Sequence, residues 1–106
     1  MQNKIEMVND VDDNGLPTGG AVIGTGIAIE WQNGPLGRDA DRKEPNGAFV
    51  EDVLRAVIDR IKFYQGTKFN CRENAIALTN CETALLWLEA RTREREARGV
   101  EGTHQI

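Results

Sequence analysis

The fold is decided by residues 49–98, which read FVEDVLRAVIDRIKFYQGTKFNCRENAIALTNCETALLWLEARTREREAR. In the first part of this stretch, apolar side chains recur every three or four residues, as they do on the packed face of an amphipathic helix. They are Val50, Val53, Leu54, Val57, Ile58 and Ile61. Gly66 then supplies the end of this helix, because glycine interrupts a helical run.

A second helix follows the short link of residues 66–70. Asn70 is a typical N-cap residue, Glu73 completes a capping box with it, and Phe69 occupies the hydrophobic staple position. The apolar stripe continues through Ala77, Leu78, Cys81, Ala84, Leu85 and Leu88. A helix from about residue 71 to residue 98 is roughly 40 Å long at 1.5 Å per residue. The short link makes the two helices antiparallel neighbours.

The region before the hairpin carries the β structure. Residues 21–32, AVIGTGIAIEWQ, are apolar and β-branched and predict one strand or a hairpin that bends near Gly24 and Gly26. Residues 1–19 and 36–46 have loop composition, although residues 4–8 are able to pair as a short strand. We therefore predict a single α+β domain over residues 1–106, with a small N-terminal β-hairpin or sheet and loops in 1–46 and a long antiparallel helical hairpin and tail in 47–106.

Charge is divided unequally along the 106 residues, whose formal net charge is −4. Residues 1–52 carry four Lys or Arg against ten Asp or Glu, whereas residues 53–106 carry nine against seven. This balance argues against a protein that coats DNA, because such binding needs many cations facing phosphates. A chain this short also buries little surface alone, so we expect a homo-oligomer.

Familiar catalytic and metal motifs do not occur. Cys71 and Cys81 form no C-x-x-C pair, and His104 stands alone, so no zinc-ligand set can be assembled in one chain. The Gly24-Thr25-Gly26 segment lacks the third glycine of a dinucleotide fingerprint. We predict a non-enzymatic protein without metal or cofactor. Because no membrane span or signal peptide is recognisable, we also expect it to be soluble and cytoplasmic.

The C-terminal arginines of the second helix are locally paired to different degrees. Arg93 and Arg98 each follow a glutamate by four residues, which favours a helical ion pair. Arg95 instead follows Arg91 at that spacing, and both continue the inner stripe of the helix beyond Leu88. Two guanidinium groups one turn apart suit an intervening phosphate, although an arginine-rich helix end is often only a solvated face.

Aromatic and carboxamide residues supply further candidates for binding. Tyr64, or alternatively Phe63, can stack on a nucleobase, and Asn74 lies near it in an antiparallel hairpin. Arg91 is about 25 Å along the helix from Asn74 at 1.5 Å per residue, so one pocket that uses both needs a second subunit. We expect Trp87 to be a packing residue, Cys81 to be a small core residue and His104 to be exposed.

Several segments together resemble the phage anti-Thoeris sponge proteins, the first-described type of Thoeris anti-defence protein. They are IEWQNGPLGR (29–38), PNGAFVEDVL (45–54), FYQ (63–65), NCRENAIA (70–77) and ALLWLEARTREREARGVEGTH (84–104). The resemblance covers most of residues 26–104, and the ending R-x-R-x-R-x-x-R-G-V-x-G-T-H is its most specific part. The related anti-CBASS cyclic-nucleotide sponges share the helical-hairpin portion.

This resemblance implies a non-catalytic protein of the host bacterial cytoplasm that sequesters a cyclic ADP-ribose isomer made by a defence TIR enzyme. It implies that Arg91 and Arg95 hold the phosphates, Tyr64 stacks on the base and Asn74 makes a polar contact, with Trp31 and Arg38 as additions. Dimers and hexamers are both implied. A separate site for cyclic di- or trinucleotides is implied at Arg98, Gly102, Thr103 and His104.

Two other classes of function stay open at this point. A helical hairpin with exposed arginines also fits an adaptor that binds a protein or a nucleic acid, whose binding to nucleic acid would depend strongly on salt. A phosphodiesterase-like hydrolase that uses a glutamate or His104 is the weakest reading, because no metal set or paired base accompanies either group.

Overall fold

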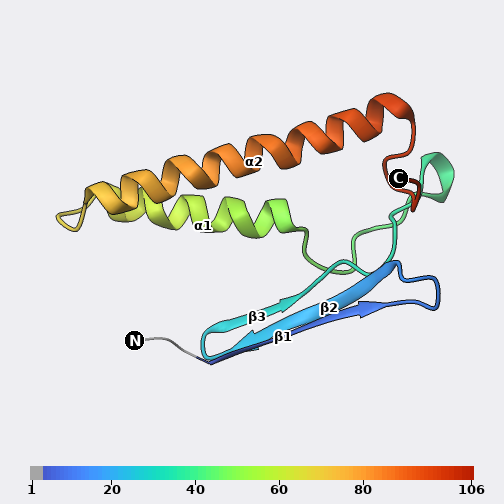
Figure 1. The fold of residues 1–106 in the computed structure, drawn as a ribbon, viewed down its shortest axis with the longest axis horizontal. Coiled ribbons are helices and arrows are strands. Elements are labelled where there is room, and N and C mark those ends of the chain that lie inside the picture. The colour runs from blue at the N-terminus through green and yellow to red at the C-terminus, as the bar shows by residue number, and fades with distance from the viewer. Residues whose placement is uncertain (1–3) are drawn as a thin grey trace. The chain divides into compact units, whose positions relative to one another are not determined.

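The computed structural model describes residues 4–106, which form two compact units. The first unit comprises the chain up to Phe49 together with Gly99–Ile106, and the second is Val50–Arg98. Figure 1 shows an antiparallel sheet in the first unit and two long helices in the second. The prediction of an α+β fold, with an N-terminal sheet followed by a helical hairpin, is confirmed.

The sheet has three antiparallel strands in the order β1-β2-β3. The strands are β1 (Ile5–Val11), β2 (Pro17–Gly24) and β3 (Ile27–Glu30). The bend expected near Gly24 and Gly26 is the turn between β2 and β3, where Gly24 pairs with Ile27. The short strand allowed for residues 4–8 is in fact longer and pairs with β2 along its length.

The segment that leaves the sheet is tied back to it before the first helix begins. The N–H of Gln32 donates to the carbonyl of Ala48 at 3.0 Å, and the N–H of Ala48 donates to the carbonyl of Glu30 at 2.7 Å. Between these contacts the chain forms a loop with one 3₁₀ turn at Asp39–Asp41, as the loop composition predicts. The residues that close this loop are thereby anchored to the end of β3.

Two antiparallel helices form the second unit (Figure 1). They are α1 (Val50–Gln65) and α2 (Arg72–Arg98). An ion pair joins Arg55 to Glu89 at 3.2 Å, and another joins Lys62 to Glu82 at 3.7 Å. The later residue of α1, Lys62, pairs with the earlier residue of α2, Glu82, so these contacts establish the antiparallel register.

The capping box predicted at Asn70 is wrong. The side-chain amide of Asn70 donates to the carbonyl of Thr67 at 2.7 Å, which uses it within the turn between the helices. Gln65 holds both backbone groups of Cys71, at 3.1 Å from its N–H and 3.0 Å from its carbonyl. Cys71 therefore precedes the first turn of α2, where its sulfur accepts the N–H of Asn74 at 3.4 Å.

Hydrophobic burial within the chain is slight. Ile58 of α1, at 7% exposure, is the buried core residue of the described part of the chain. Leu86 is 63% exposed and Trp87 is 74% exposed, so the packing expected of Trp87 does not occur within this chain. The half-buried row of α2 follows alternating steps of four and three residues, through Cys81, Leu85, Leu88 and Thr92. Trp87 does not fall on this row, which explains its exposure. No helix formed by residues 4–106 has the length and apolar character needed to cross a membrane.

Candidate functional site

The arginine-rich end of α2 is partly neutralised by glutamates on the same helix. Arg93 lies 3.9 Å from Glu89, and Arg98 forms an ion pair with Glu94. Both pairs have the spacing of four residues that the sequence predicts, so these two predictions are confirmed. Glu89 also accepts Arg55, which makes it the shared partner of two arginines. The hydrogen bond to Glu89 is the main cause that raises the pKa of Arg55 above its ordinary value.

The half-buried row of α2 corrects the position of one predicted residue. Past Leu85 and Leu88 the row continues to Thr92 and Arg95, whereas Arg91 is exposed. The step from Leu85 to Leu88 is three residues, so the next step along a helical stripe is four and reaches Thr92. The prediction that Arg91 continues the inner stripe is therefore wrong, whereas that for Arg95 is confirmed.

Arg91 and Arg95 nevertheless lie one turn apart on α2. Arg91 forms no ion pair with any side chain of residues 4–106. An exposed guanidinium of this kind presents its planar set of donors to solvent, a geometry that fits phosphate oxygens. Arg91 thus lies one turn before Arg95 of the half-buried row and presents its guanidinium group to solvent.

Tyr64 and Phe63 lie in the last turns of α1, and Asn74 lies in the first turn of α2. Tyr64 is 39% exposed and Phe63 is 57% exposed, so both rings are accessible. The Tyr64 hydroxyl accepts a hydrogen bond from Arg60 Nε at 3.1 Å. The spacing of four residues between Arg60 and Tyr64 is readable from the sequence, yet the sequence interpretation did not include Arg60.

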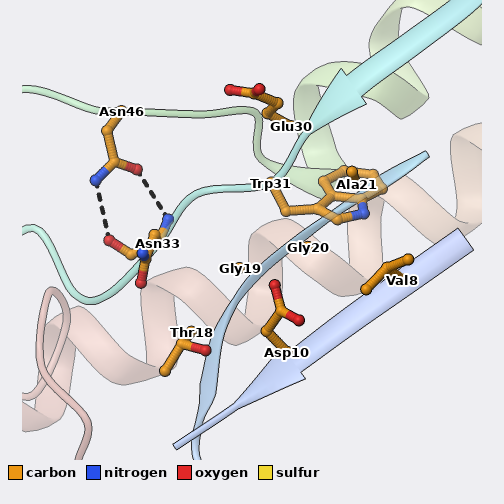
Figure 2. Close-up of a pocket in the computed structure, with 10 residues that line it drawn as sticks. All are labelled: Val8, Asp10, Thr18, Gly19, Gly20, Ala21, Glu30, Trp31, Asn33 and Asn46. Atoms are coloured by element: carbon orange, nitrogen blue, oxygen red, sulfur yellow. Dashed lines mark hydrogen bonds between the residues drawn. The ribbon is translucent and has the colours of Figure 1, made fainter. Parts of the chain in front are cut away.

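A cavity of about 480 Å³ lies in the sheet unit beside Trp31. Figure 2 draws the Trp31 indole across Ala21 of β2, and the Asp10 carboxylate of β1 belongs to the same lining. The Glu30 carboxylate also belongs to the lining, but in Figure 2 it points away from the indole. None of the described residues that line this cavity carries a positive charge. The lining therefore suits a nucleobase or hydroxyl groups better than a phosphate.

Two features of the structure shape the lining of this cavity. Asn46 Oδ1 accepts the N–H of Asn33 at 2.8 Å, and Asn46 Nδ2 donates to the Asn33 carbonyl at 3.1 Å (Figure 2). Gly20 has a φ of 144°, and a Cβ there would clash with the carbonyl of Val8. The sequence prediction did not include lining residues from β1, such as Asp10. The pairing of β1 with β2 brings them to the cavity, and no local motif indicates this.

Arg38, predicted as a ligand contact, has a structural partner in the C-terminal tail. Its Nη1 donates to the carbonyl of Glu101 at 3.1 Å. Arg42 forms an ion pair with the Glu101 carboxylate at 2.7 Å, and the N–H of Gly37 donates to the carbonyl of Gly102 at 2.8 Å. We call residues 37–42 and 101–102 with these contacts the tail lock.

The four residues predicted for a second site fall in different surroundings. Arg98 belongs to the helical unit and is paired with Glu94. Gly102 is part of the tail lock, and a Cβ there would clash with the Gly37 carbonyl. The Thr103 hydroxyl donates to the carbonyl of Val100 at 2.5 Å, whereas His104 is exposed, as expected. Among residues 4–106, no group of three or more His, Cys, Asp or Glu side chains is placed to hold a metal ion.

The helical hairpin with its preceding strand also identifies the family. The family model described as Acb2/Tad1, hairpin domain, matches residues 25–93, which include β3, α1 and most of α2. The chain belongs to this hairpin family. The expected relationship to the phage anti-Thoeris proteins is thereby confirmed.

A relative within this family comes from a bacterial virus. The chain is 48% identical over 77 residues to the protein named Thoeris anti-defense 1 of Bacillus phage SBSphiJ7. The matched region covers 73% of this chain and 51% of the relative, so the chain spans about half the length of that protein.

Proposed function

We propose that this chain is a non-catalytic sponge that captures a cyclic ADP-ribose isomer in the host cytoplasm and thereby counteracts Thoeris immunity. The observation that carries the proposal is the match of residues 25–93 to the hairpin family, together with 48% identity to a protein named Thoeris anti-defense 1. A sponge needs only tight binding, because a captured signal no longer reaches its receptor. Nanomolar affinity corresponds to about −12 kcal/mol.

The charge arrangement on α2 supports capture of a pyrophosphate. Arg91 is exposed and forms no ion pair with residues 4–106, and Arg95 follows it by one turn. Hydrogen bonds between guanidinium groups and phosphates are charge-assisted and about twice as strong as neutral ones. In the proposal, these two arginines hold the phosphates of the ligand.

The aromatic end of the hairpin supports recognition of the adenine base. Tyr64 presents an accessible ring, and Asn74 adds a carboxamide in the first turn of α2. Trp31 and Arg38 remain additional candidates, although the bond from Arg38 to Glu101 gives that arginine a structural role as well. Cyclic di- or trinucleotides at Arg98, Gly102, Thr103 and His104 form a separate part of the proposal.

The proposed site requires a second subunit. Asn74 and Arg91 are about 25 Å apart along α2, farther than one small ligand spans. An antiparallel second copy would bring the aromatic end of one hairpin to the arginine end of the other. The exposure of Leu86 and Trp87 supports such association, because large apolar side chains on a surface commonly mark an interface. The proposed assembly is a dimer or a hexamer.

Calorimetry tests the proposal directly. The purified protein is titrated with the cyclic ADP-ribose isomer produced by a Thoeris TIR enzyme, and the ligand is then recovered by heat denaturation. Tight binding with intact ligand is the expected result, whereas degraded ligand would establish an enzyme. Binding to RNA or DNA that weakens steeply with salt and disappears in Arg91→Ala would instead establish a nucleic-acid adaptor.

A further inference from the structure

The last turns of α1 carry an exposed cluster of one cation and two aromatic rings, Arg60, Phe63 and Tyr64, which we call the Arg60 cluster. The guanidinium carbon of Arg60 lies 5.0 Å from the centre of the Phe63 ring and 4.8 Å from the centre of the Tyr64 ring. The ring centres are 5.9 Å apart and the ring planes are inclined by 55°. Because both rings are exposed, burial in a hydrophobic core does not account for this order.

Tyr64 is fixed at both of its ends. Its hydroxyl oxygen accepts Arg60 Nε at 3.1 Å. Its backbone carbonyl accepts the Thr67 hydroxyl at 2.6 Å and the Thr67 N–H at 3.0 Å. The position of the ring in the free protein is therefore set by contacts within the hairpin.

We propose that Arg60 is a positioning residue that presents Tyr64, and not Phe63, as the base-stacking ring of the ligand site. The inference rests on the proposed function. The guanidinium covers one face of Tyr64, so the opposite face is the one that a purine would stack on. Phe63 has no hydroxyl for Arg60 to bind, and it serves as the second ring against which the guanidinium packs.

The hydrogen bond also sets the polarity of the Tyr64 hydroxyl. Since the hydroxyl oxygen accepts Arg60 Nε, its own proton is directed elsewhere and is available to an acceptor on the ligand. A ring nitrogen of a purine and a phosphate oxygen are both such acceptors. The Arg60 cluster is thus suited to a ligand that has a purine face next to an anionic group.

The effect of losing Arg60 follows from preorganisation. A tyrosine that is free before binding must be immobilised by the ligand, which weakens affinity by about two- to tenfold. Arg60→Lys keeps the positive charge but removes Nε and the planar group, so it tests positioning separately from charge. In a Tyr64→Phe background, the same Arg60→Lys change has a smaller effect, because the hydrogen bond is already absent.

The experiment measures binding of the TIR-produced cyclic ADP-ribose isomer to wild type, Arg60→Lys, Tyr64→Phe and the double variant. Arg72→Lys is the matched control, since it replaces an exposed guanidinium at the first residue of α2. The sequence contains one tyrosine, so ¹³C-labelled tyrosine reports Tyr64 alone in NMR spectra. We expect weaker binding and faster ring motion in Arg60→Lys, with wild-type values in Arg72→Lys and similar melting temperatures throughout.

Failure of this inference is distinguishable from failure of the proposed function. If wild type binds the ligand and Arg60→Lys binds it equally well, the positioning role is overturned while the sponge survives. If wild type does not bind, the sponge proposal fails, and the relaxation of the labelled tyrosine decides the positioning role alone. A Tyr64 ring that is as rigid in Arg60→Lys as in wild type overturns it in either case.

Discussion

The guanidinium of Arg55 on α1 lies 3.2 Å from a carboxylate oxygen of Glu89 on α2, although 34 residues separate them in sequence. The same carboxylate group lies 3.9 Å from Arg93. One glutamate therefore helps to set the register of the hairpin and also neutralises one arginine of the C-terminal cluster. At the same end of α2, Glu94 neutralises Arg98.

Exchanging the charges of Arg55 and Glu89 should lower the melting temperature less than reversing the charge of Arg55 alone. We expect Arg55→Glu to lower the melting temperature of the hairpin, because the new carboxylate would face Glu89 and Asp52, the two present partners of the arginine. The double variant Arg55→Glu/Glu89→Arg should recover part of the loss. Circular dichroism melts measure both, and the differences should shrink in high salt because the contact is exposed. Equal stability of all variants in low salt would show that the ion pair does not fix the register.

Arg95→Ala is expected to weaken ligand binding by about 2 kcal/mol or more, which is roughly 30-fold in Kd, because a phosphate loses a charge-assisted partner. The melting temperature should change little. Arg93→Ala is the matched control, since Arg93 lies on the same turn of α2, pairs with Glu89 and is not among the proposed ligand contacts. Calorimetry measures the affinity of both variants. A large loss of stability in Arg95→Ala would assign that arginine a structural role.

Ile58→Ala should destabilise the hairpin by about 2–5 kcal/mol, as truncation of a buried isoleucine leaves a cavity. Val57→Ala is a useful comparison, because Val57 is the neighbouring residue on the same helix and is 42% exposed. Urea unfolding followed by circular dichroism measures both free energies of unfolding. Equal losses would mean that a partner subunit covers Val57 as thoroughly as the hairpin covers Ile58.

Gly102→Ala should destabilise the sheet unit by more than Gly26→Ala does. Both glycines have a φ of 78°, so each substitution carries a backbone strain of about 1–2 kcal/mol. A Cβ at Gly26 meets nothing within 4 Å, whereas a Cβ at Gly102 clashes with the Gly37 carbonyl. Hydrogen exchange of the β2 amides reports the difference. Equal protection in the two variants would contradict the tail lock.

Leu86→Glu and Trp87→Glu should each reduce self-association, because a charge would replace an exposed apolar side chain. Ile106→Glu is the control, since Ile106 is 96% exposed at the C-terminal tail. Light scattering of the purified variants measures the mass of the assembly. An unchanged mass in both helix variants would place the interface between subunits elsewhere.

The hairpin was predictable because its signal is local. Apolar residues at three- and four-residue spacing define α1, and Gly66 ends it by donating its N–H to the carbonyls of Lys62 and Phe63 at 3.1 Å. The ion pairs of Arg93 and Arg98 were predictable for the same reason. The cap at Asn70 failed because Gln65, on the preceding helix, holds the backbone of Cys71 and shifts the start of α2.

Features that depend on distant parts of the chain were not readable from the sequence. The sequence indicated only that residues 4–8 could pair as a short strand, because the full length of β1 depends on its pairing with β2, and all of its residues are exposed. Arg38 meets Glu101 across 63 residues, and no local pattern predicts that contact. The Arg60 cluster differs from these, because spacings of three and four residues on one helix would have revealed it.

The tail lock has a consequence for the order of events during synthesis. The hairpin is continuous in sequence, whereas the sheet unit takes its last residues from beyond α2. As the chain emerges from the ribosome, both helices are complete before Glu101 and Gly102 exist to meet Arg38, Arg42 and Gly37. Translation therefore finishes both helices before the sheet unit can acquire its contacts with Glu101 and Gly102.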